Sequence, residues 1–163
     1  GMDGIEKIIK ENSLIKAYKD GKDKEARWNM MMASTEGAMA FSKGLGAVHS
    51  MSHATGANQE LRLHHGTLNA VILPAVLEFN QNHVGNKYSR IARAMGKNES
   101  INLANEIRKL NENIGIPSGL AEMGVTEDMI PELVTHSITD PSNLTTPRLP
   151  SEEEWEKLFL ESM

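Results

Sequence analysis

The feature that most constrains the fold is a long segment, from Met30 to Gln81, that is nearly free of charge. Charged residues make up 24% of the whole chain. The segment's only charged side chains are Glu36, Lys43, Glu60, Arg62 and Glu78. Charged side chains are rarely buried, because an unpaired charge is costly to remove from water. We therefore expect this segment to form the core of the domain.

One part of the segment has the pattern of a buried helix. From His65 or Gly66 to Phe79, apolar residues occupy almost every side of a predicted helix. A helix that is apolar all round is buried on all sides. Pro74 lies inside it and lacks a backbone donor, so we expect the helix to kink or to restart there.

Apolar residues recur at intervals of three and four elsewhere, which predicts further amphipathic helices. Suitable N-cap residues precede four of them: Asp23, Asn98, Thr126 and Ser151. The predicted ranges are 5–18, 23–42, 46–56, 88–95, 98–114, 126–134 and a terminal helix from 151. The helix at 23–42 carries several small residues, so we expect it to lie at the centre of the bundle.

The sequence contains no alternating strand pattern of useful length and no long internal repeat. We therefore predict an all-α fold, a bundle of about seven or eight helices. A chain of 163 residues fits a single domain, here residues 2–163. Gly1 precedes Met2 as a residue left by an expression tag would, and is set aside.

Composition excludes several kinds of site and partner. Cysteine is absent, which rules out disulfides, thiolate metal ligands and a cysteine nucleophile. The net charge is −5, without the basic footprint of a nucleic-acid-binding protein. No apolar run approaches the roughly 18 residues of a membrane span, so neither nucleic acid nor membrane is an expected partner. The N-terminus has no apolar signal core, and the lack of cysteine suits a reducing compartment, so we expect a cytoplasmic protein.

Four of the six histidines lie between Gly44 and Asn80: His49, His53, His64 and His65. The first two are four residues apart, so a regular helix places them on one face, where they can share an Fe, Zn, Ni or Cu ion. The other two stand at the start of the next helix and can supply a third imidazole. Hydrogen-bonded packing in a helical core explains the same spacing, and spacing alone does not decide between the two.

The residues around the histidines narrow the chemistry. Zinc peptidases also use two histidines four apart, but with a Glu directly after the first. Ser50 follows His49 here, which argues against a peptidase. The nearby acids are Glu60, in a predicted loop, and Glu78, on the far side of its helix. The metal site that this chain provides is therefore expected to be incomplete.

Two runs in this stretch carry a likeness to a known family. GLGAVHSMSH at 44–53 and HGTLNAVILP at 65–74 closely resemble the second signature of the iron-containing (group III) alcohol dehydrogenases. EFN at 78–80, IP at 116–117 and TPR at 146–148 resemble further landmarks of that family. The resemblance spans nearly the whole chain. It implies the C-terminal, all-helical, dehydroquinate-synthase-like half of such an enzyme, which binds the metal.

The resemblance also implies a ligand set. In the family an N-terminal α/β domain binds NAD(P), and an aspartate and three histidines bind one divalent ion, iron or zinc. Two of these ligands precede the region matched here. The other two carry over to His49 and to His65, the histidine directly before Gly66. The segment between His53 and His65 is longer than in the commonest members and adds His64, which is the alternative to His65.

His53 matches a histidine near the nicotinamide and the substrate, and so is the implied catalytic and cofactor-facing residue. Its near-neutral pKa range suits movement of the hydroxyl proton. The ion polarises the alcohol oxygen while hydride leaves for NAD(P). The implied reaction interconverts a small-molecule alcohol with an aldehyde or ketone.

Three interpretations of the isolated chain remain. In the first it is the helical domain of such a dehydrogenase, lacks the N-terminal nucleotide-binding domain and is inactive alone. In the second it is a stand-alone or partner-dependent binding module, and the exposed former interdomain face drives homo-oligomerisation. A non-redox hydrolase with a histidine-bound metal ranks last, because no general-base carboxylate stands beside the histidines.

Overall fold

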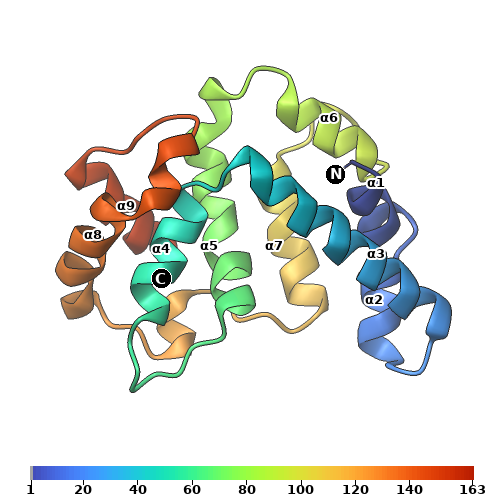
Figure 1. Ribbon diagram of the computed structural model, residues 1–163, viewed down its shortest axis with the longest axis horizontal. Coiled ribbons are helices and arrows are strands. Elements are labelled where there is room, and N and C mark those ends of the chain that lie inside the picture. Colours follow the sequence, from blue (N-terminus) through green and yellow to red (C-terminus); the bar gives the residue numbers. More distant parts are fainter. Residues whose placement is uncertain (1) are drawn as a thin grey trace. The chain divides into compact units, whose positions relative to one another are not determined.

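The computed structural model describes residues 2–163, and in this part of the chain it contains helices and no strand (Figure 1). Gly1 lies outside the described residues. The all-α prediction is confirmed. The α-helices of residues 2–163 are α1 (Met2–Ile5), α2 (Ser13–Lys19), α3 (Lys24–Ala40), α4 (Ala47–Gly56), α5 (His65–Asn80), α6 (Lys87–Ala94), α7 (Leu103–Asn113), α8 (Ile130–Thr139) and α9 (Glu152–Glu161). Short 3-10 or π segments are η1 (Glu6–Lys10), η2 (Phe41–Lys43), η3 (Gln81–His83), η4 (Leu120–Met123), η5 (Glu127–Met129) and η6 (Pro141–Thr145).

The chain divides into two units. One holds α1 to α3 and α6, from the residues up to Lys43 and from Val84–Asn102. The other holds α4, α5 and α7 to α9, from Gly44–His83 and Leu103–Met163. The prediction of a single domain over 2–163 stays a prediction. All four histidines of the predicted site belong to the second unit.

In the first unit, the helix predicted at 5–18 is interrupted. Asn12 has a positive φ of 60°, in the left-handed region, and separates η1 from α2. Asn adopts this conformation more readily than most residues. Next to it, Asn29 on α3 donates from Nδ2 to Ser13 Oγ at 3.1 Å, which holds the start of α2 against α3. One predicted helix is therefore three helical segments.

Helix α3 begins as predicted but does not lie where predicted. The Asp23 side chain accepts from the Ala26 backbone N–H at 2.9 Å, which confirms it as the N-cap. Only Ala26 and Ala33 of α3 are buried, whereas Trp28 is 62% exposed and Met39 72%. The prediction that this helix is central is wrong, because most of its small residues (Gly37, Ala38 and Ala40) are exposed together with its large apolar residues.

The core of the second unit lies between α4, α5, α8 and α9, which lie side by side in Figure 1. Its largest side chains are fully buried: Met51, Leu68, Ile72, Trp155 and Phe159. Each such side chain contributes about 1.5–3 kcal/mol of burial free energy relative to exposure. This packing fixes α4 and α5, the two helices that carry the histidines.

Helix α5 is continuous through Pro74 and does not restart there. Proline at this position cannot donate to the carbonyl of Ala70, four residues earlier. Asn111 on α7 donates from Nδ2 to that carbonyl at 2.7 Å. The side chain from α7 therefore replaces the hydrogen bond that the proline removes.

Of the three other predicted N-cap residues, Ser151 is correct, whereas Asn98 and Thr126 are wrong. Ser151 and Glu154 form the expected capping box at the start of α9. Asn98 instead accepts from the Ser100 backbone N–H in a turn, and α7 begins only at Leu103. Thr126 makes no side-chain cap, and the 3-10 segment η5 precedes α8. No helix within residues 2–163 is long and apolar enough to cross a membrane.

Candidate functional site

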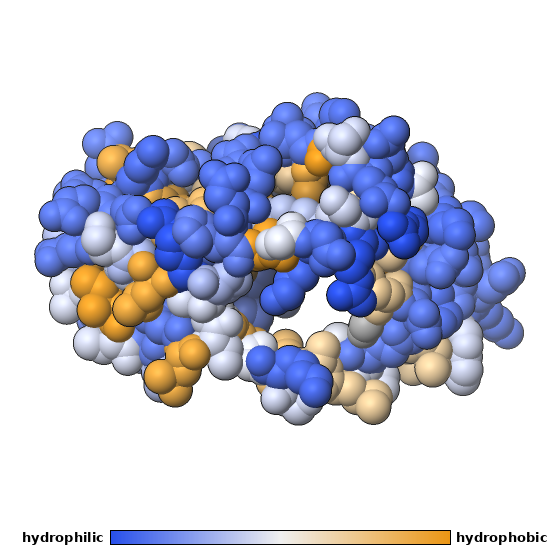
Figure 2. Space-filling view, turned by 90° about the horizontal axis from the view of Figure 1, so that it is seen from above, coloured by the Kyte–Doolittle hydropathy of each residue, from blue (hydrophilic) through white to orange (hydrophobic). Residues whose placement is uncertain are grey.

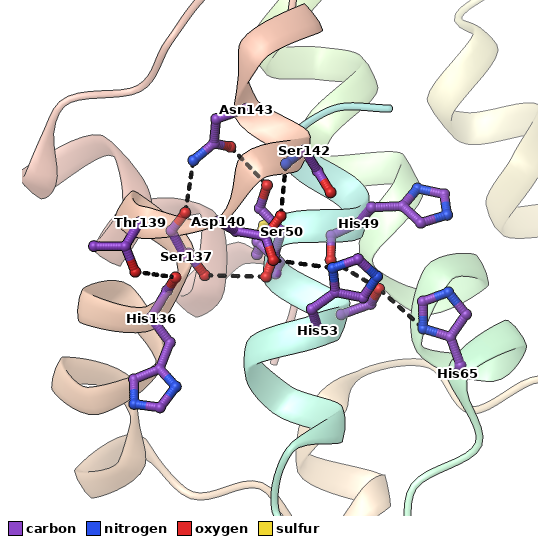
Figure 3. Close-up of polar contacts among 12 residues, drawn as sticks. His49, Ser50, His53, His65, His136, Ser137, Thr139, Asp140, Ser142 and Asn143 are labelled. Atoms are coloured by element: carbon purple, nitrogen blue, oxygen red, sulfur yellow. Dashed lines mark hydrogen bonds and ion pairs between the residues drawn. The ribbon is translucent and has the colours of Figure 1, made fainter. Parts of the chain in front are cut away.

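Three imidazoles of the second unit lie together (Figure 3). His49 and His53 lie one turn apart on α4, and His65 is the first residue of α5. The ring centroids of His49 and His65 are 5.4 Å apart, those of His53 and His65 5.3 Å, and those of His49 and His53 5.8 Å. We call these three side chains the histidine cluster.

His64 has a different role at the start of α5. It is the N-cap residue, and its Nδ1 accepts from the Thr67 backbone N–H at 3.3 Å. Gly66 leaves room for this arrangement, because a Cβ there would lie 3.1 Å from His64 Cε1. The His64 ring is therefore bound to its own helix end. The two remaining histidines, His83 and His136, are exposed, as expected for ordinary surface residues.

Neighbouring side chains fix the His65 ring at both nitrogens. Asn69 Nδ2 lies 3.0 Å from Nε2, and Ser52 Oγ lies 3.4 Å from Nδ1. Because the amide donates, Nε2 accepts, and Nδ1 carries the proton that points to Ser52. Ser52 Oγ in turn donates to the backbone carbonyl of His49 at 3.2 Å. The Nε2 lone pair of His65 is thus engaged by the Asn69 amide, and an ion bound at Nε2 would replace that hydrogen bond.

His53 pairs with a residue that the sequence analysis missed. Its Nδ1 lies 3.0 Å from Oδ2 of Asp140, at the end of α8. The other oxygen, Oδ1, accepts from the Ser142 backbone N–H at 2.7 Å. Asp140 is the N-cap of η6, and Asp followed by Pro141 is a pattern typical of a helix start. That pattern predicts the turn, but not the contact with His53.

Burial and neighbouring charges set the protonation of the site. Burial lowers the pKa of His49, and the nearby His65 and His53 lower it further, against a smaller raising effect of Asp140. Burial raises the pKa of Asp140, but hydrogen bonds from Ser142 and His53 outweigh it, and the net pKa is lowered. At neutral pH, His49 is therefore a neutral imidazole, the form that binds metals, and Asp140 is a carboxylate.

Two rings of the cluster, His49 and His65, are compatible with a shared divalent ion. A histidine nitrogen binds such an ion at about 2 Å, so two imidazoles on one ion have ring centroids roughly 5 Å apart. The separation of His49 and His65 is close to this. Beside His65, Asn69 Oδ1 is buried without a hydrogen-bond partner, an orphaned polar atom at the same place. Within residues 2–163, no group of three or more His, Cys, Asp or Glu side chains is arranged so that it could hold a metal ion.

Comparison with known proteins places the chain in a family. Residues 2–163 match the Fe-containing alcohol dehydrogenase family, C-terminal. The chain is 40% identical to 4-hydroxybutyrate dehydrogenase of Cupriavidus necator, over 99% of this chain and 44% of that protein. It is 38% identical to NAD-dependent methanol dehydrogenase of Bacillus methanolicus, over 88% of this chain and 39% of that protein. The chain therefore spans less than half the length of these relatives.

A solved structure shares the fold. The crystal structure of a 1,3-propanediol oxidoreductase matches with a TM-score of 0.91 and 32% identity, over 99% of this chain and 44% of that one. An alcohol dehydrogenase from Oenococcus oeni matches with the same TM-score at 27% identity. Since the family match covers every described residue and the fold is that of these structures, the chain belongs to the Fe-containing alcohol dehydrogenase family and is its C-terminal domain.

Proposed function

We propose that this chain is the helical metal- and substrate-binding domain of an NAD(P)-dependent, iron- or zinc-dependent alcohol dehydrogenase. The enzyme would interconvert a small-molecule alcohol with an aldehyde or ketone. The observation that carries the proposal is the meeting of His49, His53 and His65 in one cluster. The dehydrogenase activities in the names of the relatives support the same reaction class.

In this proposal, His49 and His65 hold the ion. Burial lowers the pKa of His49, which favours the neutral imidazole that binds metals, and Nε2 of His65 would bind the ion in place of its hydrogen bond with Asn69. His64 is the weaker candidate, because its Nδ1 already caps α5. Gly66 supports His65 indirectly, by making room for the His64 ring.

His53 is the proposed catalytic residue. A bound divalent ion supplies polarisation of the alcohol or carbonyl oxygen, and a bound nicotinamide accepts or donates the hydride. His53 takes the hydroxyl proton during oxidation and returns it during reduction, a task suited to an imidazole. Its position between Asp140 and the other two rings supports this role.

We also propose that the 163-residue chain does not oxidise alcohols by itself. By the resemblance, none of these 163 residues corresponds to the family's nucleotide-binding domain or to two of its four metal ligands. Two imidazoles bind an ion more weakly than a four-ligand site does.

Cobalt titration of the purified chain, followed by ligand-field absorbance, tests the metal site. His49→Ala and His65→Ala should each lower the affinity by more than the roughly 10–100-fold typical of losing an outer-shell partner. His64→Asn is the matched control, because Asn keeps an N-cap acceptor and should leave the affinity unchanged. Loss of affinity in His64→Asn but not in His65→Ala would assign the ligand to His64. Equal affinity in all variants would refute the site.

A second function is favoured by the exposed apolar residues of α3 and of the start of η2. Trp28, Met31 and Met39 of α3 and Phe41 of η2 are each more than half exposed, and the first three lie on one face of α3. Exposed apolar patches are typical of interaction surfaces. The chain would then be a binding module that self-associates or captures a partner subunit through this face. Light scattering of the purified chain tests it: a monomer at all concentrations counts against self-association.

A further inference from the structure

The environment of His53 points to one more residue for the proposed reaction. Asp140 approaches His53 from η6, whereas the His65 ring stacks against His53 with an interplanar angle of 18° (Figure 3). The carboxylate is nearly buried, with 14% of its side chain exposed. A buried carboxylate needs hydrogen bonds, and His53 provides one of them.

The hydrogen-bond chemistry fixes which His53 nitrogen carries the proton. The lowered pKa of Asp140 keeps it ionised, and a carboxylate only accepts hydrogen bonds. Nδ1 of His53 must therefore be the donor across the 3.0 Å contact. In the neutral ring this leaves the lone pair on Nε2.

The position of Asp140 is itself fixed by side chains outside the histidine cluster. Ser50 Oγ on α4 donates to Asn143 Oδ1 at 2.6 Å, and Asn143 Nδ2 donates to the carbonyl of Ser137 on α8 at 2.6 Å. Ser50 and Ser137 are fully buried. At the end of η6, Thr145 Oγ1 donates to the carbonyl of Leu45 at 2.7 Å. These bonds tie η6 to α4 at Ser50 and to the segment just before α4 at Leu45, so Asp140 is held against the helix that carries His53.

We infer that Asp140 is a positioning residue for the proposed dehydrogenase, which holds His53 in the Nδ1–H tautomer with Nε2 as its proton acceptor. The inference rests on the proposed function for its catalytic meaning. In the proposed oxidation the alcohol O–H bond would break and an N–H bond would form at Nε2 of His53. A bound nicotinamide would accept the hydride from the C–H bond as the carbonyl forms. The carboxylate of Asp140 stabilises the imidazolium that results, as a buried acid beside a catalytic histidine does.

Nitrogen-15 NMR of the metal-free chain, at a pH where the imidazoles are neutral, tests the inference. Two-bond proton–nitrogen correlations report which ring nitrogen is protonated. We expect His53 to carry its proton on Nδ1 in the parent chain. In Asp140→Ala the Nε2–H form, which a solvated histidine side chain prefers, should become the major one. His83, which is exposed, is the internal reference and should not change.

Two results would overturn the inference: a proton on Nε2 of His53 in the parent chain, or an unchanged tautomer in Asp140→Ala. The parent measurement keeps the test decisive even if Asp140→Ala does not fold. Asn143→Ala, which removes the tie to α4 but keeps Asp140, should give a mixture of the two tautomers. The tautomer is measured without metal, so its outcome is separate from the cobalt titration that tests His49 and His65.

Discussion

At the scale of single residues, the side chains that define the site meet partners far away in the sequence. His53 and Asp140 are 87 positions apart, and Ser50 and Asn143 are 93 apart. The histidines stand out because they gather in a stretch with little charge. Asp140 does not stand out, because an Asp before a Pro in a turn-rich segment is ordinary. Its role depends on a contact that the folded chain creates.

Tyr88 on α6 should show a strong pH dependence. Burial raises its pKa to about 12, above the usual value of about 10 for tyrosine. Between these values the unfolded chain releases the proton and the folded chain keeps it. The free energy of unfolding should therefore fall as pH rises through this window, and should not respond to Tyr88 below it.

Absorbance at the tyrosinate band measures this ionisation. Tyr18→Phe provides the background in which Tyr88 is the single tyrosine, since the chain has two. The midpoint should lie near 12 in the folded chain, and Tyr88→Phe should remove the corresponding loss of stability. A midpoint near the usual tyrosine value would show that Tyr88 is solvated.

At the scale of elements, the backbone hydrogen bonding of α5 is completed by a side chain from α7, a later helix. Its apolar pattern predicts burial correctly, and Leu68 and Ile72 are fully buried. The pattern does not show how Pro74 is tolerated, because the compensating donor is Asn111 on α7. Helix starts that rely on nearby residues, such as Asp23 and Ser151, were predictable, since a cap is a local interaction.

Asn111→Ala should lower the stability of the chain by about 1–3 kcal/mol, because it leaves the carbonyl of Ala70 unpaired. Chemical denaturation followed by circular dichroism measures this change. Pro74→Ala is the matched background: alanine restores the backbone N–H, so Asn111→Ala should cost less there. Equal costs in both backgrounds would mean that Asn111 does not compensate for the proline.

At the scale of the whole molecule, the exposed apolar side chains are the basis of the proposed association. Figure 2 shows hydrophilic residues over most of the visible face, with apolar residues in separate patches. The face of α3 with Trp28, Met31 and Met39 is the one we propose for association.

Met39→Glu should reduce self-association of the chain, because a charge on an apolar contact surface must be desolvated on binding. Leu160→Glu is the matched control. It places the same charge at an exposed apolar position, 46% exposed, in the last turn of another helix, α9. Analytical ultracentrifugation over a range of concentrations compares the two. If both variants associate equally, α3 is not part of the interface.

The sequence by itself determined the all-α class, the burial of α5 and most helix ranges. It also showed that four histidines gather in one stretch with little charge. These properties follow from periodicity, local capping and residue chemistry, which act over a few neighbouring positions. It did not determine the left-handed Asn12, the exposure of α3 or the late start of α7, where packing outweighs local propensity.

The tertiary structure alone decided which side chains meet. It brought His65 beside His49 and His53, bound His64 to the end of α5, and brought Asp140 to His53 from a distant turn. Contacts between positions many residues apart depend on how whole helices pack, and no short sequence pattern encodes that packing. For this reason the histidines could be singled out from the sequence, and the contact of Asp140 with His53 could not.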